Sequence, residues 1–218
     1  MAFPMKAVLS MPKLIMKTFS DPKHNHTELV EQFVHLAERA RREGLLALEQ
    51  ETANIHDPML KKGVMLVVDG TDPEVVKGIM EVEVIAREGR HEVGIGLFEA
   101  LGGFAPTLGI LGTVMGLIRI LAHMDNAAAL GPAISTAFTA TLYGVGSANL
   151  FWLPLATKLK RRTAEEAEMG ALIIDGTLAI QAGDNPRIVK EKLGGYLSPS
   201  HGKKKGAAEP EDAKGKAA

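Results

Sequence analysis

The chain has 218 residues and a formal net charge of −1, from 25 basic and 26 acidic side chains. This balance excludes a strongly basic nucleic-acid-binding protein, and the absence of cysteine excludes a disulfide framework, a thiolate metal site and a cysteine nucleophile. A mean hydropathy of +0.06 alongside 23% charged residues predicts separate polar and very apolar segments.

Residues 1–22 are predicted to form an amphipathic helix at a membrane surface. Lys6, Lys13 and Lys17 interrupt the apolar residues of this stretch too often for a signal peptide, and no small-residue cleavage site follows. Pro12 is expected to bend or start the helix.

Residues 23–93 are predicted to form a cytoplasmic helical domain that begins with one long helix over 25–53. Asn25 and Glu28 resemble a capping box, and apolar residues then recur at helical spacing. The run "ARREGLLALEQE" (40–51) is charged, and such a run is most often a solvated helix face.

Two aspartate–proline pairs predict the next helices of this domain. Asp57-Pro58 and Asp72-Pro73 each read as an N-cap followed by proline at the first helical position. They predict helices over 58–69 and 73–92, with Gly70 as a stop between them. The valines after Pro73 would also suit a strand, but their helical spacing favours a helix that continues into the apolar segment.

Residues 94–158 are predicted to form a transmembrane hairpin with spans over 97–121 and 131–156. No acidic or basic residue lies between Glu99 and Arg119, or between Asp125 and Lys158. Each stretch is long enough to cross a bilayer as a helix, which takes about 20 residues. The segment "HMDNAAALGP" (123–132) between them is short and turn-like.

The basic residues predict the direction of this hairpin. They flank its outer ends, whereas the turn holds neither lysine nor arginine, although Arg119 lies just before it. The positive-inside rule therefore places both outer ends in the cytoplasm. The flanking residues are Arg87, Arg90, Lys158, Lys160, Arg161 and Arg162.

Both predicted spans carry a face of small residues. Gly109, Gly112 and Gly116 share one helix face, and small residues let membrane helices approach closely. The second span repeats this spacing with Ala133, Ala137, Thr141, Gly144 and Ala148. Either the two spans pack on each other through these faces, or the faces also receive helices from other subunits or spans.

Prolines and hydroxyls inside the apolar spans suggest a polar path. Pro106 frees the carbonyl of the residue four positions earlier, and Pro154 does the same in the second span. Thr113 and Thr141 add hydroxyls at mid-span. Neither span carries a central acid, lysine or histidine, so an ion-binding group would have to come from another chain.

Residues 159–197 are predicted to be cytoplasmic C-terminal helices, and 198–218 a disordered tail. One long helix is expected over 155–182, a stop at "GDNP" (183–186), and a short helix over 187–193. The tail is rich in lysine, glycine and alanine.

A soluble enzyme with a buried helical hairpin is the alternative from another class of protein. The sequence contains no phosphate loop, no HExxH pair and no spacing of a nucleophile with its base. Gly94 and Gly96 lack the third glycine and the preceding strand of a dinucleotide site. His24 and His26 fit a solvated turn better than a metal site, so the sequence predicts a protein that is not an enzyme.

Four stretches, taken together and in order, resemble the A subunit of the bacterial flagellar stator, the MotA/PomA family. They are "ARREGLLALE" (40–49), "FAPTLGILGTVMGLI" (104–118), "LGPAISTAFTATLYGVGSANLFWLPLATKLKRR" (130–162) and "QAGDNPRIVKEKL" (181–193). The resemblance extends from residue 3 to about residue 197. The more distant TolQ/ExbB energisers of outer-membrane transport share the hairpin and remain the alternative.

The resemblance implies an all-α membrane protein whose transmembrane helices extend into a helical cytoplasmic domain. It implies a multi-pass subunit of the bacterial inner membrane, in a ring of five A subunits around two B subunits (MotB/PomB). Flow of H⁺ or Na⁺ between the subunits, with no cofactor, would drive rotation, and the cytoplasmic part would push on the rotor protein FliG. The essential ion-binding aspartate belongs to the B subunit.

The resemblance also implies residue roles. Pro106 and Pro154 match the two prolines that couple ion flow to conformational change, while Arg41 and Glu49 match the charged pair proposed to engage the rotor. Thr113 and Thr141 match hydroxyl positions along the ion path, and the threonine at 113 favours sodium. Family members have four spans, and the two that precede the segment matching "FPMKAVLSMPKLIMKTF" are expected to be missing here.

Overall fold

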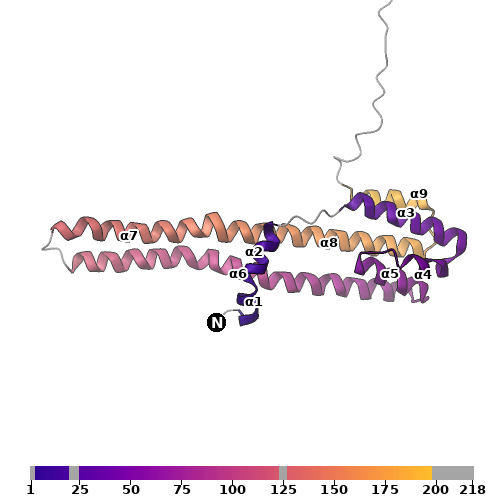
Figure 1. The fold of residues 1–218 in the computed structure, drawn as a ribbon, viewed down its shortest axis with the longest axis horizontal. Coiled ribbons are helices and arrows are strands. Elements are labelled where there is room, and N and C mark those ends of the chain that lie inside the picture. Colours follow the sequence, from indigo (N-terminus) through magenta and orange to yellow (C-terminus); the bar gives the residue numbers. More distant parts are fainter. Residues whose placement is uncertain (1–2, 20–24, 123–126, 198–218) are drawn as a thin grey trace, which may run out of the picture. The chain divides into compact units, whose positions relative to one another are not determined.

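The computed structural model of the chain describes residues 3–19, 25–122 and 127–197, and every regular element in these ranges is a helix (Figure 1). The all-helical prediction is therefore confirmed for the described residues. The elements are α1 (Met5–Leu9), α2 (Met11–Phe19), α3 (His26–Glu43), the 3-10 helix η1 (Leu45–Ala47), α4 (Leu48–Glu51), α5 (Pro58–Val68), α6 (Pro73–Leu121), α7 (Ala127–Ser147), the π-helix η2 (Ala148–Trp152), α8 (Leu153–Gln181) and α9 (Pro186–Gly194).

The helices form two compact units. The first, here called the hairpin unit, contains residues 1–23 and 81–170, and the second, the bundle unit, contains residues 24–80 and 171–218. The long helices α6 and α8 each contribute residues to both units.

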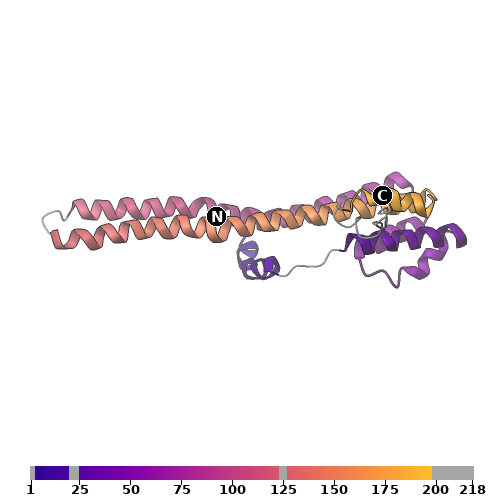
Figure 2. The same ribbon diagram turned by 90° about the horizontal axis from the view of Figure 1, so that it is seen from above.

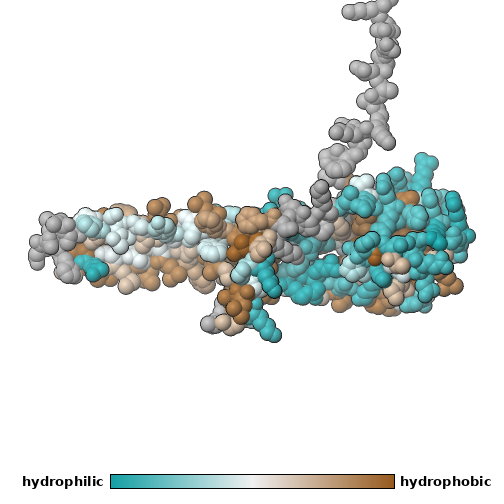
Figure 3. All heavy atoms as spheres, in the orientation of Figure 1, coloured by the Kyte–Doolittle hydropathy of each residue, from teal (hydrophilic) through white to brown (hydrophobic). Residues whose placement is uncertain are grey.

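In the hairpin unit, α6 and α7 lie side by side (Figures 1 and 2). Among the described residues, α6 is the one helix that is long and apolar enough to cross a membrane. Only 6% of its most apolar stretch of 18 residues is buried. The second predicted span is divided among α7, η2 and α8, so its crossing stays a prediction. Apolar side chains are exposed along both arms (Figure 3), including Phe104, Leu108, Met115, Ile118, Phe138, Leu142, Leu150 and Phe151.

A separate apolar cluster holds α2, α6 and the start of α8 together in the hairpin unit. Phe98 is fully buried and its ring stacks on Trp152, with ring centroids 6.3 Å apart. Met11, Leu14 and Ile15 of α2 pack against the same cluster. The predicted helix over 1–22 is thus two helices, and Pro12 lies in the first turn of the second.

The bundle unit has a conventional core. Fully buried side chains come from α3, α4, α5, α6, α8 and α9. Gly176 lets the Phe33 ring approach α8, since an added Cβ atom would lie 2.6 Å from two ring carbons. α3 packs on α9. The largest of the buried side chains are Phe33, Leu36, Leu48, Met59, Leu60, Met80, Leu172, Ile173 and Leu193.

Several predicted helix ends are confirmed. The Asp57 carboxylate accepts hydrogen bonds from the backbone N–H groups of Met59 (2.8 Å) and Leu60 (2.9 Å), so α5 begins at Pro58 as expected. Gly70 has a φ of 72° and follows the end of α5. Asn185 caps α9, accepting from the Arg187 N–H at 3.1 Å.

Two predictions near the start of the bundle unit are wrong. The single helix over 25–53 is interrupted at Gly44, whose φ of 87° and ψ of 167° lie where only glycine is unstrained. The capping box is also absent, because Asn25 makes no side-chain cap bond and its amide instead donates to Glu28 Oε2 at 3.4 Å.

The long helices differ from the expected ones mainly at their ends. α6 runs unbroken from Pro73 to Leu121, which excludes the strand considered for its valines and confirms continuation into the apolar segment. α7 begins at Ala127, four residues before the predicted start. Residues 123–126 of the predicted turn and the predicted tail over 198–218 lie outside the described residues.

Candidate functional site

The contact between α6 and α7 is made by glycines. A Cβ atom built on Gly144 would lie 2.6 Å from the Ala105 carbonyl oxygen and 2.8 Å from the Gly109 Cα atom. Cβ atoms on Gly112 and Gly116 would lie 2.8 Å and 2.7 Å from alanine methyl groups of α7. Each of the four glycines chosen from the sequence thus faces the other arm of the hairpin. Of the two alternatives left open above, packing between the two spans accounts for all four.

This close approach brings the two predicted path threonines together. The Thr113 and Thr141 hydroxyls, 28 residues apart in sequence, are in direct hydrogen-bond contact. Thr113 Oγ1 also lies 3.0 Å from the Ala137 carbonyl and 3.2 Å from that of Gly109, which is 3.4 Å from Thr141 Oγ1. Two hydroxyls and two carbonyls therefore form a small oxygen cluster between otherwise apolar helices.

The oxygen cluster has more acceptors than protons. Each hydroxyl has one hydrogen to donate, so Thr113 and Thr141 can use only two of their possible contacts at a time. Both side chains are half-buried. Because no ionisable residue lies between Glu99 and Arg119, the cluster has no charge of its own. It can exchange hydrogen-bond partners but cannot by itself release or capture a proton.

Pro106 and Pro154 lie at different kinds of helical distortion. α6 continues through Pro106, although proline cannot donate to the Gly102 carbonyl. Pro154 follows the π-helix η2. The backbone hydrogen bonds of a π-helix span one residue more than those of an α-helix. Gly102 faces Leu153, since its added Cβ atom would lie 2.5 Å from Leu153 Cδ2. Gly102, whose carbonyl Pro106 leaves without its helical donor, therefore packs against Leu153, the residue directly before Pro154.

The sequence analysis did not identify the π-helix. The available signal was Asn149, a polar residue within an apolar span and five positions before Pro154. Its side-chain amide donates to the Val145 carbonyl at 2.9 Å, satisfying a backbone group of the preceding turn. Short π segments occur often at functional positions of α-helices.

Arg41 and Glu49, predicted to bind the rotor, lie in different helices of the bundle unit. Arg41 is in the last turn of α3 and Glu49 is in the first turn of α4, on either side of the break at Gly44. Both side chains are exposed. The predicted single helix would instead have put them about 80° apart around one axis.

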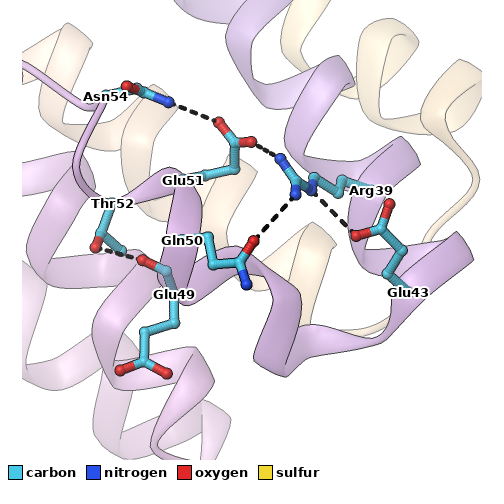
Figure 4. A network of polar contacts seen from close by, with 7 residues as sticks. All are labelled: Arg39, Glu43, Glu49, Gln50, Glu51, Thr52 and Asn54. Atoms are coloured by element: carbon cyan, nitrogen blue, oxygen red, sulfur yellow. Dashed lines mark hydrogen bonds and ion pairs between the residues drawn. The ribbon is translucent and has the colours of Figure 1, made fainter.

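A polar network that sequence analysis missed joins these two helices (Figure 4). Arg39 Nη1 is paired with the Glu51 carboxylate, and its guanidinium also contacts Glu43 (3.3 Å) and Gln50 (3.5 Å). Asn54 Nδ2 lies 3.5 Å from the second oxygen of Glu51. Arg39 and Glu51 are 12 positions apart in sequence, so helical spacing does not predict this pair. The available signal was Gly44, because the helix break there permits the pairing.

Comparison with known proteins identifies the family. Residues 51–170 match the MotA/TolQ/ExbB proton channel family. The chain is 43% identical over 197 residues to motility protein A of Bacillus subtilis, covering 90% of this chain and 73% of that protein. It is 37% identical over 198 residues to the chemotaxis protein PomA of Vibrio alginolyticus, covering 91% and 78% respectively.

A solved structure agrees with these relatives. The fold matches a chain of the flagellar MotAB stator complex from Bacillus subtilis with a TM-score of 0.85 and 42% identity, covering 91% of this chain and 78% of that chain. The relatives and the structure all point to motility proteins rather than to the TolQ/ExbB alternative. The chain is an all-α membrane protein that belongs to the MotA/TolQ/ExbB proton channel family, in its motility protein A (MotA/PomA) group of flagellar stator subunits.

Proposed function

We propose that this chain works with a B subunit to convert the flow of H⁺ or Na⁺ across the inner membrane into torque on the flagellar rotor. The observation that carries the proposal is the paired hydroxyls of Thr113 and Thr141, held between apolar helical stretches that have no acidic or basic residue of their own. Such a hairpin can line an ion path but needs an acid from elsewhere.

The partner that supplies this acid is a stator B subunit. The similar Bacillus subtilis structure is a MotAB complex, which supports the same pairing here. Exposed apolar side chains on both arms, such as Leu108 and Leu142, would be covered by lipid, by the B subunit and by further copies of the chain. We propose the pentameric ring of A subunits that the family resemblance implies.

The ion path runs past the oxygen cluster. An ion released from the B-subunit acid would meet Thr113 and Thr141, and the threonine at 113 favours sodium. Each ion that crosses supplies about 2.3 kcal/mol per 100 mV of membrane potential. Pro106 and Pro154, which flank the Gly102–Leu153 contact, would let the two arms flex as the ion binds and leaves.

The rotor contact is assigned to the other unit. We propose that exposed Arg41 and Glu49 engage FliG from the cytoplasmic side, where the positive-inside rule places the outer ends of the hairpin. Cells that carry Arg41→Glu together with Glu49→Lys should fail to swim although stator complexes still assemble. Wild-type swimming by these cells would remove the rotor assignment.

The main experiment is co-expression with a stator B subunit, followed by swimming speed against sodium concentration at fixed pH. A speed that rises with sodium supports the sodium path, a speed that does not depend on sodium supports protons, and no rescue of a stator-less strain overturns the proposal. Thr113→Ala and Thr141→Ala should slow swimming. Thr139→Ala is the matched control, because this exposed hydroxyl bonds only to the Ser135 carbonyl of its own helix, at 2.7 Å.

A further inference from the structure

The chain reverses direction between the two residues assigned to the rotor. α3 ends at Glu43, Gly44 takes its positive φ, and η1 leads into α4. The Gly44 N–H donates to the Ala40 carbonyl at 2.9 Å and the Ala47 N–H donates to the Gly44 carbonyl at 3.2 Å. These backbone bonds shape the turn locally, but none of them ties α4 back to α3.

The tie between the two helices is the Arg39–Glu51 ion pair. Both oxygens of Glu51 are engaged, one by the Arg39 guanidinium and the other by Asn54. The Glu51 side chain is 14% exposed and that of Arg39 is 29% exposed, whereas Glu43, the other acid beside Arg39, is 54% exposed. A shielded pair is screened less by water and salt than an exposed one. Gln50 adds a contact to the same guanidinium.

Helical geometry links this pair to the exposed charges. Residues two apart on a helix point about 200° apart, so they lie on nearly opposite sides. Arg39 faces the network while Arg41, two residues later, is exposed. In Figure 4 the Glu51 carboxylate points toward Arg39, and the Glu49 carboxylate points away from the network. Leu48, which is fully buried three residues before Glu51, anchors the same face of α4.

We propose that Arg39 and Glu51 are positioning residues for rotor binding: their ion pair closes the turn at Gly44 and holds the outward-facing Arg41 and Glu49 at a fixed separation. This inference rests on the proposed rotor contact. Without the pair, α4 keeps Leu48 as its anchor but gains freedom to rotate and swing about Gly44. Arg41 and Glu49 then sample many separations, and few of them match the rotor.

A distance measurement tests this directly. The chain has no cysteine, so Arg41→Cys and Glu49→Cys carry two spin labels without background. In the assembled stator complex, pulsed dipolar spectroscopy should give a narrow distance distribution that broadens with Glu51→Ala. The swapped pair, Arg39→Glu with Glu51→Arg, should narrow it again. An equally narrow distribution in Glu51→Ala would overturn the inference.

The matched control is Glu43→Ala. It also removes a carboxylate from Arg39, but Glu43 lies in the same helix and cannot tie α4 to α3. The label distribution should therefore stay narrow. Broadening in Glu43→Ala as large as in Glu51→Ala would show a general loss of helix order and would also overturn the inference.

Cells with unlabelled stators give the functional readout. Glu51→Ala should reduce the docking of stator units at motors severalfold at unchanged membrane abundance, and the swapped pair should restore docking. If Arg41→Glu with Glu49→Lys abolishes docking while Glu51→Ala docks like wild type, this inference fails and the proposed rotor contact stands. If the Arg41 and Glu49 reversals leave docking unchanged, the rotor contact itself fails.

Discussion

The two units of the chain distribute their apolar residues in opposite ways. In the hairpin unit, Leu108 is 64% exposed and Leu142 71% exposed, while glycines lie in the contact between the arms. In the bundle unit, Phe33 and Leu60 are fully buried, and the face drawn in Figure 3 is mostly hydrophilic.

The difference shows which force holds each unit together. Large side chains removed from water stabilise the bundle unit by the hydrophobic effect. The arms of the hairpin unit instead approach through backbone and small side chains, which is how helices associate when their surroundings are as apolar as they are. We therefore expect the bundle unit to be destabilised when side-chain volume is removed from its core. We expect the hairpin unit to be destabilised when side-chain volume is added between its arms.

The largest effect is expected from a truncation in the bundle core. Phe33→Ala should destabilise the bundle unit by about 3–5 kcal/mol, because the ring is fully buried against Gly176. Pulse proteolysis of the assembled chain in increasing urea measures this. Phe33→Leu should cost less, and equal losses from both variants would contradict a volume effect.

In the hairpin unit, adding volume should be harmful. Gly144→Ala places a methyl group 2.6 Å from a backbone oxygen, so it should cost about 1–3 kcal/mol by overpacking and reduce assembled stator on native gels. Gly146→Ala is the matched control, since nothing lies within 4 Å of its added Cβ atom. Equal assembly by the two variants would argue against the glycine contact.

A substitution at Gly44 tests backbone strain without a change in packing. Its added Cβ atom would meet nothing within 4 Å, yet its φ of 87° is unfavourable for alanine. Gly44→Ala should therefore destabilise the turn by about 1–3 kcal/mol. Faster proteolysis between α3 and α4 checks this. Gly89→Ala, which is equally open but helical, should show no such cleavage, and cleavage in both variants would contradict the strain argument.

The smallest effects are expected at the helix caps of the bundle unit. Asp57→Ala removes two hydrogen bonds to backbone N–H groups and should cost about 1 kcal/mol in urea unfolding followed by pulse proteolysis. Asn25→Ala should have almost no effect, because Asn25 makes no side-chain cap bond. A larger loss from Asn25→Ala than from Asp57→Ala would reverse this assignment.

Local signals in the sequence predicted most of the helices. The Asp57-Pro58 and Asp72-Pro73 pairs mark their helix starts because capping depends on a few neighbouring residues. Helical spacing predicts one helix through Gly44 because a single glycine costs a helix only about 1 kcal/mol, whereas the break goes with tertiary contacts, the pairing of Arg39 with Glu51 and the burial of Leu48. Asn25 and Glu28 have the residue types and spacing of a capping box. The Asn25 side-chain amide, however, donates to the Glu28 carboxylate instead of accepting from a backbone N–H.

The geometry of the candidate site required the fold. Sequence reasoning placed Thr113 and Thr141 in different spans, but their contact depends on the register between α6 and α7, which the glycine contacts set. Arg41 and Glu49 came from resemblance alone, and resemblance says nothing of the turn that separates them.

The stacking of Trp152 on Phe98 at the end of η2 makes the hairpin unit its own optical reporter. The chain has no other tryptophan, so its tryptophan emission comes from this indole alone. If η2 relaxed to ordinary α geometry, the residues before it would turn by about 100° and shift by about 1.5 Å relative to those after it. Such a step would change the neighbours of the indole, and stopped-flow mixing with the coupling ion could then time the motion of the helix without any dye.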